Sequence, residues 1–435
     1  ISRSADGRLI GGCVLPSGTP GDPNCGAYNN GVTTARIVFR TVIQEEFSDT
    51  FPSGDSSVDQ GDVLNNTETV NGRLLSTIDV TTPTGFTEAD GSSASVTIGR
   101  GVLSKAVYAV NGVTPPPSPV RVASGDTVTF RLTYTLITSD FEALALTDYL
   151  PLPIFSATEA TAHNNIVCGV PTAGTSCLGP SDTYHLLPGA VNPVVSNDGV
   201  SNWVRWAYGN YDSATNMAST IDLLFTVTVE DDPFADNMHL TNQAYATEGS
   251  TNGAPGEAAS IIEITFAAPV MTTTKSVVAT NAPAPTFTPA LPIAFTPPGS
   301  GPLRWGGTIN SNLLTTTPID SDVSGLDAGD LVTFAIFLVN EGSGINGAFD
   351  IAIRDTFDAA GFEFPTLGDP NSLNLQIYYG NGSGPIPYTG APDDLFGTGI
   401  ELVDPPSGDG VCQAHDPVSG NNVIVITYDL RLRND

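Results

Sequence analysis

The sequence predicts an all-β protein built from tandem β-sandwiches, and three observations support that fold class. Glycine and proline are abundant, and threonine, valine, serine and asparagine dominate the remaining composition. β-branched residues suit pleated strands, while glycine, proline and asparagine suit tight turns. Apolar and polar residues also alternate along several runs, and similar runs recur along the chain. These patterns indicate many strands joined by turns.

The alternation is clearest in residues 126–136, "DTVTFRLTYTL". Apolar side chains from Val128 to Leu136 share one face, while threonines and an arginine share the other, which is the period of a half-buried strand. Residues 223–231 and 423–432 contain similar runs, and turn signals separate such runs. No amphipathic helix longer than two turns is expected, so we expect the units to be Ig-like β-sandwiches.

Internal repeats predict the domain organisation. Three stretches recur as matched pairs: residues 123–137 with 327–341, residues 62–72 with 238–249, and residues 92–105 with 257–275. Their order predicts the back part of a first sandwich at 1–101, a complete sandwich at 102–268, and the front part of a third at 269–435 with a Pro/Thr-rich insertion at about 280–325. We therefore expect the chain to begin and end within a repeat, as a segment of a longer array would.

The formal charge of −31 narrows the range of partners. Nucleic acids and anionic membranes would repel so acidic a protein, so neither is expected to bind it. No apolar run approaches the roughly 20 residues of a membrane span, so direct membrane insertion is not expected. The charge is compatible with an extracellular or cell-surface location. No cofactor is expected, and calcium is the alternative.

The five cysteines indicate an oxidising compartment. Cys13 and Cys25 bracket one Gly/Pro-rich loop, and Cys168 and Cys177 bracket another. Close pairs without C-x-x-C spacing favour two local disulfides over a zinc site, and reduced buried thiols are the alternative. The sequence after Cys412 resembles that after Cys25, so Cys412 is expected to be the second member of a loop pair whose first member is missing.

Four segments of the complete repeat point to a known family: "SKAVYAVNG", "SGDTVTFRLTYTL", "LALTDYLPLPIF" and "LTNQAYAT". They resemble the conserved repeat domain of bacterial and archaeal surface proteins (domain of unknown function eleven), and the resemblance extends over nearly the whole chain. The pattern is also similar to Ig-like pilin and adhesin modules that form intramolecular Lys–Asn isopeptide bonds. In those modules the lysine lies on the first strand, the asparagine on the last, and an acidic residue between them.

The chain contains only two lysines, Lys105 and Lys275, and they occupy equivalent repeat positions. Strand parity places Lys105, Asp148 and Asn242 on the apolar faces of their strands. A buried lysine beside a buried carboxyl loses its charge easily, because desolvation lowers the pKa of the amine and raises that of the acid. The neutral amine can then attack the asparagine carboxamide while the protonated acid polarises its carbonyl. We therefore predict a Lys105–Asn242 amide promoted by Asp148; the alternative is a first strand that ends in a partly exposed lysine.

Each flanking repeat contains only part of this set of lysine, acid and asparagine. The third repeat has Lys275 and Asp355 but no asparagine strand, whereas the first stretch has Asn66 but no lysine. Either the same polypeptide continues, or a neighbouring chain donates the missing strand. The second route predicts head-to-tail assembly with copies of itself, with Asn66 of one copy beside Lys275 of the next.

Weaker motifs add secondary predictions. Asp320 and Asp322 resemble the first half of a calcium loop, although the final glutamate is absent. Asn65 and Asn381 head N-x-S/T triplets and are candidate glycosylation sites. The run "GSGING" leads into a predicted strand, so it is expected to be a turn and not a dinucleotide loop.

The function expected from these observations is structural. The resemblance implies a subunit or segment of an extracellular filament, stalk or cell-surface adhesin. The alternative is a secreted carbohydrate- or protein-binding module, with the aromatic patch around Trp203 and Trp206 as its contact surface, although both tryptophans could equally belong to the core. No catalytic constellation is present in the sequence, so an enzyme is not expected.

Overall fold

The computed structural model describes residues 36–48, 51–75, 83–162, 194–197, 200–213, 216–231, 234–299 and 301–434. The chain divides into two compact units, residues 1–58 and residues 59–435. In the first unit, Glu46 and Ser57 form an isolated antiparallel bridge. All the strands named below lie in the second unit, which confirms the predicted all-β class. Among the described residues, no helix has the length and apolarity that crossing a membrane requires.

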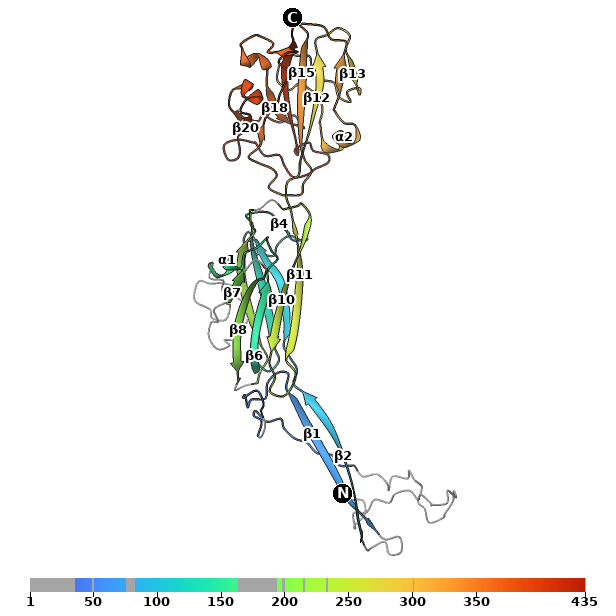
Figure 1. The fold of residues 1–435 in the computed structure, drawn as a ribbon, viewed down its shortest axis with the longest axis vertical. Coiled ribbons are helices and arrows are strands. Elements are labelled where there is room, and N and C mark those ends of the chain that lie inside the picture. The colour runs from blue at the N-terminus through green and yellow to red at the C-terminus, as the bar shows by residue number, and fades with distance from the viewer. Residues whose placement is uncertain are drawn as a thin grey trace, which may run out of the picture. The chain divides into compact units, whose positions relative to one another are not determined.

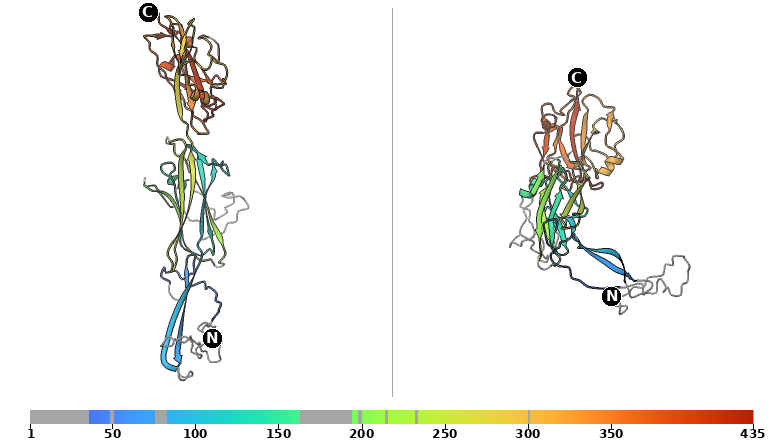
Figure 2. Two further views of the ribbon diagram at one scale, coloured as in Figure 1. Left: turned by 90° about the vertical axis from the view of Figure 1, so that its right-hand side faces the viewer. Right: turned by 60° about the horizontal axis from the view of Figure 1, so that its bottom comes forward.

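The second unit begins with a β-hairpin. Strand β1 (Val63–Leu75) pairs antiparallel with β2 (Pro83–Thr97), and in the described part of the chain these two strands pair with no others. Figures 1 and 2 show the hairpin in blue as a two-stranded ribbon. Its described side chains from Asn65 to Arg73 and from Thr84 to Thr97 are exposed, so neither face of most of the hairpin is covered.

Two sheets formed by strands between residues 102 and 266 pack face to face (Figure 1). The first sheet has the order β3-β5-β9, with β3 (Val102–Val110), β5 (Thr127–Leu136) and β9 (Ser219–Thr228). The second has the order β4-β11-β10-β6-β8-β7, with β4 (Arg121–Val122), β6 (Phe141–Tyr149), β7 (Val194–Asn197), β8 (Asn202–Tyr211), β10 (Met238–Glu248) and β11 (Gly256–Phe266). A short helix, α1 (Ala157–Ala162), follows β6. We call this pair of sheets the middle sandwich.

The core of the middle sandwich follows the predicted alternation. Every second residue of β5 from Val128 to Leu136 is buried, as its sequence pattern predicted. The Phe225 ring lies between two other aromatic rings, with centroids 5.3 Å from that of Phe130 and 5.4 Å from that of Trp206. Apolar side chains of both sheets thus form one continuous core, and its close packing fixes the separation of the sheets.

The remaining residues form a second β-structure, which we call the third module. Its main sheet has the order β12-β15-β21-β17, and β18 also pairs with β21; the strands are β12 (Met271–Thr280), β15 (Leu331–Asn340), β17 (Phe362–Glu363), β18 (Gln376–Tyr379) and β21 (Val423–Leu432). Smaller sheets are formed by β13 (Thr286–Thr288) with β14 (Asp322–Ser324), and by β16 (Ala352–Ile353), β20 (Ile400–Leu402) and β19 (Tyr388–Thr389) in the order β16-β20-β19. The helices are α2 (Ser311–Thr316) and two 3₁₀ turns, η1 (Pro370–Leu373) and η2 (Pro392–Phe396).

The main sheet of the third module is buried on both faces. Alternate residues of β21 enter two different cores: Val423 and Val425 one, Ile424 and Ile426 the other. This differs from the half-buried strand that the sequence predicted for residues 423–432. The reason is that apolar side chains of the 280–325 segment, Trp305 among them, cover the face that would otherwise be solvated.

Candidate isopeptide site

Lys105 lies on β3, where the pleat turns it inward. Its backbone pairs with Leu132 of β5, and its side chain is fully buried. The Lys105 Nζ lies 4.8 Å from the centroid of the Phe130 ring and 6.0 Å from that of Phe225. Two aromatic faces therefore replace water around the amine, which is the environment that strand parity predicted for this lysine.

Asp148 approaches the amine from the opposite sheet. It lies on β6 and is completely buried, and the Lys105 Nζ donates a hydrogen bond to its Oδ2 atom. The other carboxylate oxygen, Oδ1, has no hydrogen-bond partner among the described residues. The structure thus places the predicted lysine and acid in direct contact.

Asn242 lies next to this pair on β10. Its neighbour Ala244 pairs directly with Asp148, so Asn242 is two residues further along the same face. The side chain is fully buried and close enough to Asp148 to influence its pKa, yet neither amide atom has hydrogen-bonding geometry with any described residue. An unpaired buried polar group costs about 1–3 kcal/mol. The unreacted amide is therefore unfavourable in this position.

The electrostatics of the site favour uncharged groups. Burial lowers the pKa of Lys105 to about 8, with Asp148 opposing the shift. Burial raises the pKa of Asp148, with Lys105 and then Asn242 opposing the rise. Both pKa shifts reduce the free-energy difference between the ion pair and the state in which the amine and the acid are neutral. A neutral amine is the nucleophile that attack on a carboxamide requires.

The third module repeats this pocket without the amide. Lys275 on β12 donates hydrogen bonds from Nζ to Asp355 Oδ1 at 2.7 Å and to the Thr356 carbonyl oxygen at 3.3 Å. Its aromatic neighbours are Phe334, at 5.2 Å, and Tyr428, at 5.9 Å, and the Tyr428 hydroxyl donates a hydrogen bond to Asp355 Oδ2. Here, however, 38% of the lysine side chain is exposed, because no counterpart of β10 and β11 covers it in the described part of the chain.

Asn66, the third predicted member of that set, lies elsewhere. It is exposed on β1, where it pairs across the hairpin with Ala94. Within this chain its side chain has neither Lys275 nor Asp355 as a hydrogen-bond partner. The structure thus brings together Lys105, Asp148 and Asn242, and separately Lys275 and Asp355.

The aromatic residues of both pockets were not identified from the sequence. Phe130 and Phe225 are paired neighbours on β5 and β9, and Phe334 and Tyr428 are paired neighbours on β15 and β21. The sequence pattern that could have identified them is one inward-facing aromatic residue on each of two strands in every repeat. Recognising it required knowledge of which strands pair.

The predicted binding patch is wrong for one of its two tryptophans. Trp206 is 1% exposed and belongs to the core, where it packs against Phe225. Trp203, at the alternate position of β8, is half-buried. The cause is the strand pleat, which sends one tryptophan inward and leaves the other near the surface.

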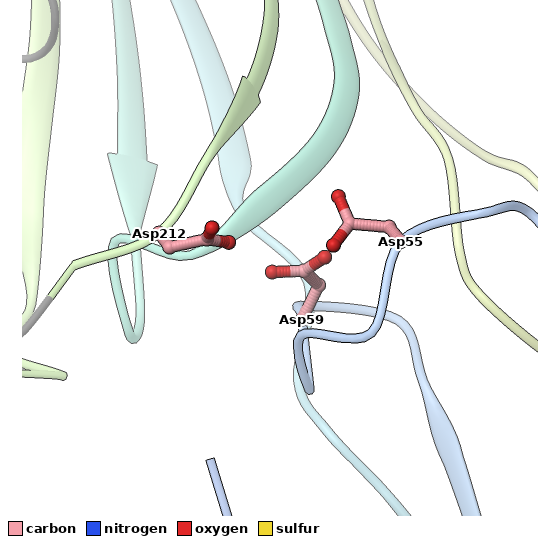
Figure 3. Close-up of side chains that lie close together, drawn as sticks. All are labelled: Asp55, Asp59 and Asp212. Atoms are coloured by element: carbon pink, nitrogen blue, oxygen red, sulfur yellow. The ribbon is translucent and has the colours of Figure 1, made fainter. Parts of the chain in front are cut away.

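The remaining predicted sites stay predictions. Asp320 and Asp322 are exposed, and among the described residues they belong to no group of three potential metal ligands. Asn65 and Asn381 are exposed, as glycosylation would require. Two other acids of the 59–435 unit, Asp59 and Asp212, have carboxylate oxygens within 4.8 Å of each other (Figure 3), and we assign no ion to them.

The cysteines differ in what the structure describes. Cys13, Cys25, Cys168 and Cys177 lie outside the described residues, so their pairing stays a prediction. Cys412 is a free, buried thiol whose Sγ donates a hydrogen bond to the Asn422 carbonyl oxygen at 3.2 Å. Burial raises the pKa of Cys412 to about 12, so the reactive thiolate is scarce at neutral pH.

Intact mass tests the bond in the middle sandwich. We expect the reduced, monomeric chain to weigh one ammonia less than its sequence requires, because forming the amide releases the asparagine nitrogen. Lys105→Ala should restore the full mass, and Lys275→Ala, which removes the equivalent lysine of the third module, should leave the deficit unchanged. A deficit that persists in Lys105→Ala would disprove the bond.

Thiol labelling tests the predicted disulfides. In the folded protein Cys412 should react slowly, since it is buried and its pKa is high. After denaturation without reductant, only Cys412 should be modified, because the other four cysteines are expected to be oxidised. Modification of all five cysteines under those conditions would contradict the disulfide prediction.

Neither a protein family nor a curated protein matches this chain. Among solved structures it is similar to BcpA, the major pilin subunit of Bacillus cereus, at 7% identity and a TM-score of 0.27 over 63% of this chain and 73% of that one. Domains D2 and D3 of the major pilin SpaD from Corynebacterium diphtheriae match at 13% identity and a TM-score of 0.23, over 60% and 85% respectively. The major pilin SpaA of the same organism matches at 13% identity and a TM-score of 0.23, over 57% and 61%. TM-scores this low do not assign the chain to the family of any of these proteins.

Proposed function

We propose that this chain is a tension-bearing structural segment of an extracellular filament, stalk or cell-surface adhesin. In this proposal a covalent amide between Lys105 and Asn242 locks its middle sandwich. The observation that supports it most is the burial of a lysine, an acid and an unpaired amide at one point between two sheets. Three such groups are costly to bury as separate polar residues, and one reaction removes most of that cost.

The reaction uses only residues of the chain. The neutral Lys105 Nζ attacks Cγ of Asn242, while protonated Asp148 donates a hydrogen bond to the carbonyl oxygen. Asp148 then relays the proton that the lysine nitrogen loses to the departing amide nitrogen, which leaves as ammonia. One C–N bond forms and one breaks, and no oxidant or cofactor is required. Each site reacts once, so the chain modifies itself and does not act as an enzyme on other molecules.

The position of the bond suits a protein under tension. It joins β3, the first strand of the middle sandwich, to β10 in the opposite sheet, so it ties together both sheets and the long segment between them. On a loop-entropy model, a cross-link that closes so long a segment contributes roughly 5 kcal/mol, by analogy with a disulfide. A soluble binding module has no comparable need for such a link.

Other features of the chain agree with an extracellular role. The predicted disulfides need an oxidising compartment, and the predicted glycosylation sites are exposed. The strong negative charge keeps an external surface solvated. Membership of the conserved repeat-domain family stays a prediction. The alternative of a binding module loses its main support, since Trp206 is part of the core.

Stretching single molecules by their ends tests this function. In the wild type, tension should pass from β3 through the amide to β10. The segment between residues 105 and 242 should then bear no force and should not extend. Lys105→Ala should release that segment, which spans roughly 450 Å when fully extended. Lys275→Ala is the matched control and should extend no further than the wild type. If wild type and Lys105→Ala release the same length, the tension-bearing role of the bond is wrong.

A further inference from the structure

An open groove beside Lys275 lies between the third module and the end of the middle sandwich that carries Phe266. The groove has a volume of about 820 Å³. Its walls include Lys275 of β12, Ile336 and Leu338 of β15, and Ile353 and Asp355 at β16. It is therefore a largely apolar channel with one ion pair in its wall, and 38% of the Lys275 side chain is exposed there.

Comparison with the middle sandwich shows which element is missing. Strand β6, which contains Asp148, lies between β10 and β8. Strand β16, which ends two residues before Asp355, pairs only with β20 in the described part of the chain. Among the described residues no strand pairs with the other edge of β16. In the middle sandwich, β10 occupies the corresponding edge, and the partner of β10 is β11. The groove thus lacks one antiparallel hairpin of the β10–β11 type.

The hairpin β1–β2 has the residues that this position requires. In the sequence match of β1 with β10, Leu64 corresponds to Leu240 and Asn66 to Asn242. Because Asn66 pairs with Ala94 and Asn242 pairs with Ile262, the match extends across the hairpin and places Val96 at the position of Ile264. Ile264 is 1% exposed within its sandwich, while Val96 is 56% exposed on the hairpin. The hairpin therefore presents a face whose counterpart is normally buried.

The hairpin of the same chain starts far from the groove. Its base is held by hydrogen bonds between Val63 and Asn252, at the turn where β11 begins. The groove includes Phe266, at the other end of β11. The length of β11, roughly 35 Å, separates the two places. The hairpin of a second copy can enter the groove without refolding along the sandwich.

We propose that the β1–β2 hairpin of one copy inserts into the groove of the third module of the next copy. This inference rests on the proposed structural function and identifies the partner. Strand β1 pairs with the edge of β16 that faces away from β20, Leu64 and Val96 of the hairpin enter the groove, and Asn66 lies beside Lys275 and Asp355. Adding a strand to an exposed sheet edge supplies main-chain hydrogen bonds as well as apolar burial. The contact is head-to-tail, so it propagates into a linear filament.

The inserted hairpin then becomes covalently attached by the same chemistry as in the middle sandwich. The Lys275 Nζ attacks Cγ of Asn66 of the neighbouring copy, Asp355 relays the proton, and the Asn66 side-chain nitrogen leaves as ammonia. One C–N bond forms and one breaks. Each junction between copies thereby becomes an amide, and the filament withstands detergent.

One residue of the hairpin departs from the pattern. Glu68 corresponds to Ala244, which pairs with Asp148, so in the inserted state it lies opposite Asp355. Two carboxylates facing each other across strands are mutually repulsive, and Lys275 offsets only part of that repulsion. Glu68→Ala is therefore expected to strengthen assembly.

Sedimentation of the full chain tests the insertion. Wild type should form concentration-dependent linear oligomers, and Val96→Asp should weaken their association by at least about tenfold, since the aspartate would be buried against the groove. Ser95→Asp is the matched control: its counterpart Glu263 is 61% exposed, so association should not change. Both substituted residues are exposed on the hairpin, so folding should be preserved. A wild type that stays monomeric, or a Val96→Asp that assembles like Ser95→Asp, would overturn the proposal.

Mixing two variants tests the covalent step. Lys275→Ala and Asn66→Ala should each give only monomers in boiling detergent with reductant, and their mixture should give a covalent dimer without higher species. A ladder from either variant alone, or no dimer from the mixture, would refute the cross-chain bond. The ammonia deficit of the monomer at Lys105 is measured separately, so failure of assembly and failure of the proposed function are distinguishable.

Discussion

The burial of Lys105 beside Asp148 is the interaction on which the middle sandwich depends. This contact joins the two sheets at a point where apolar and aromatic side chains surround it. Burying Lys105 and Asp148 there as two charged groups costs free energy. A hydrophobic pair would fill the same space more cheaply. The arrangement is understandable if the groups are reactants: burial lowers the pKa of the amine, raises that of the acid and holds the Asn242 amide within the same pocket.

The third module contains a similar pocket that is partly open. Its aromatic pair and lysine occupy equivalent strand positions, and Asp355 contacts the lysine from just beyond the end of β16. Lys275 is nevertheless partly exposed, whereas Lys105 is covered. The difference lies in the strands that carry the asparagine, which the middle sandwich has and the third module lacks in the described part of the chain. The pocket of the middle sandwich is therefore part of its core, whereas the pocket of the third module is open to solvent.

Much of the fold and the site could be predicted from residue patterns. Strand alternation and repeats predicted the all-β class, the strand from 127 to 136 and the inward placement of Lys105, Asp148 and Asn242, because these properties depend on local parity. Properties that depend on distant contacts were not predictable. Residues 423–432 are buried on both faces because a remote segment covers them. Which of the two tryptophans of β8 is buried depends on which face of that strand packs against the opposite sheet.

Nitrogen NMR of lysine tests the central claim most directly, because the chain contains only two lysines. With ¹⁵N placed at Nζ, a monomeric chain should give one signal with the shift and single attached proton of a secondary amide, from Lys105, and one amine or ammonium signal, from Lys275. Lys105→Ala should remove the amide signal alone. Two amine or ammonium signals in the wild type would show that Lys105 has not reacted and would contradict the account.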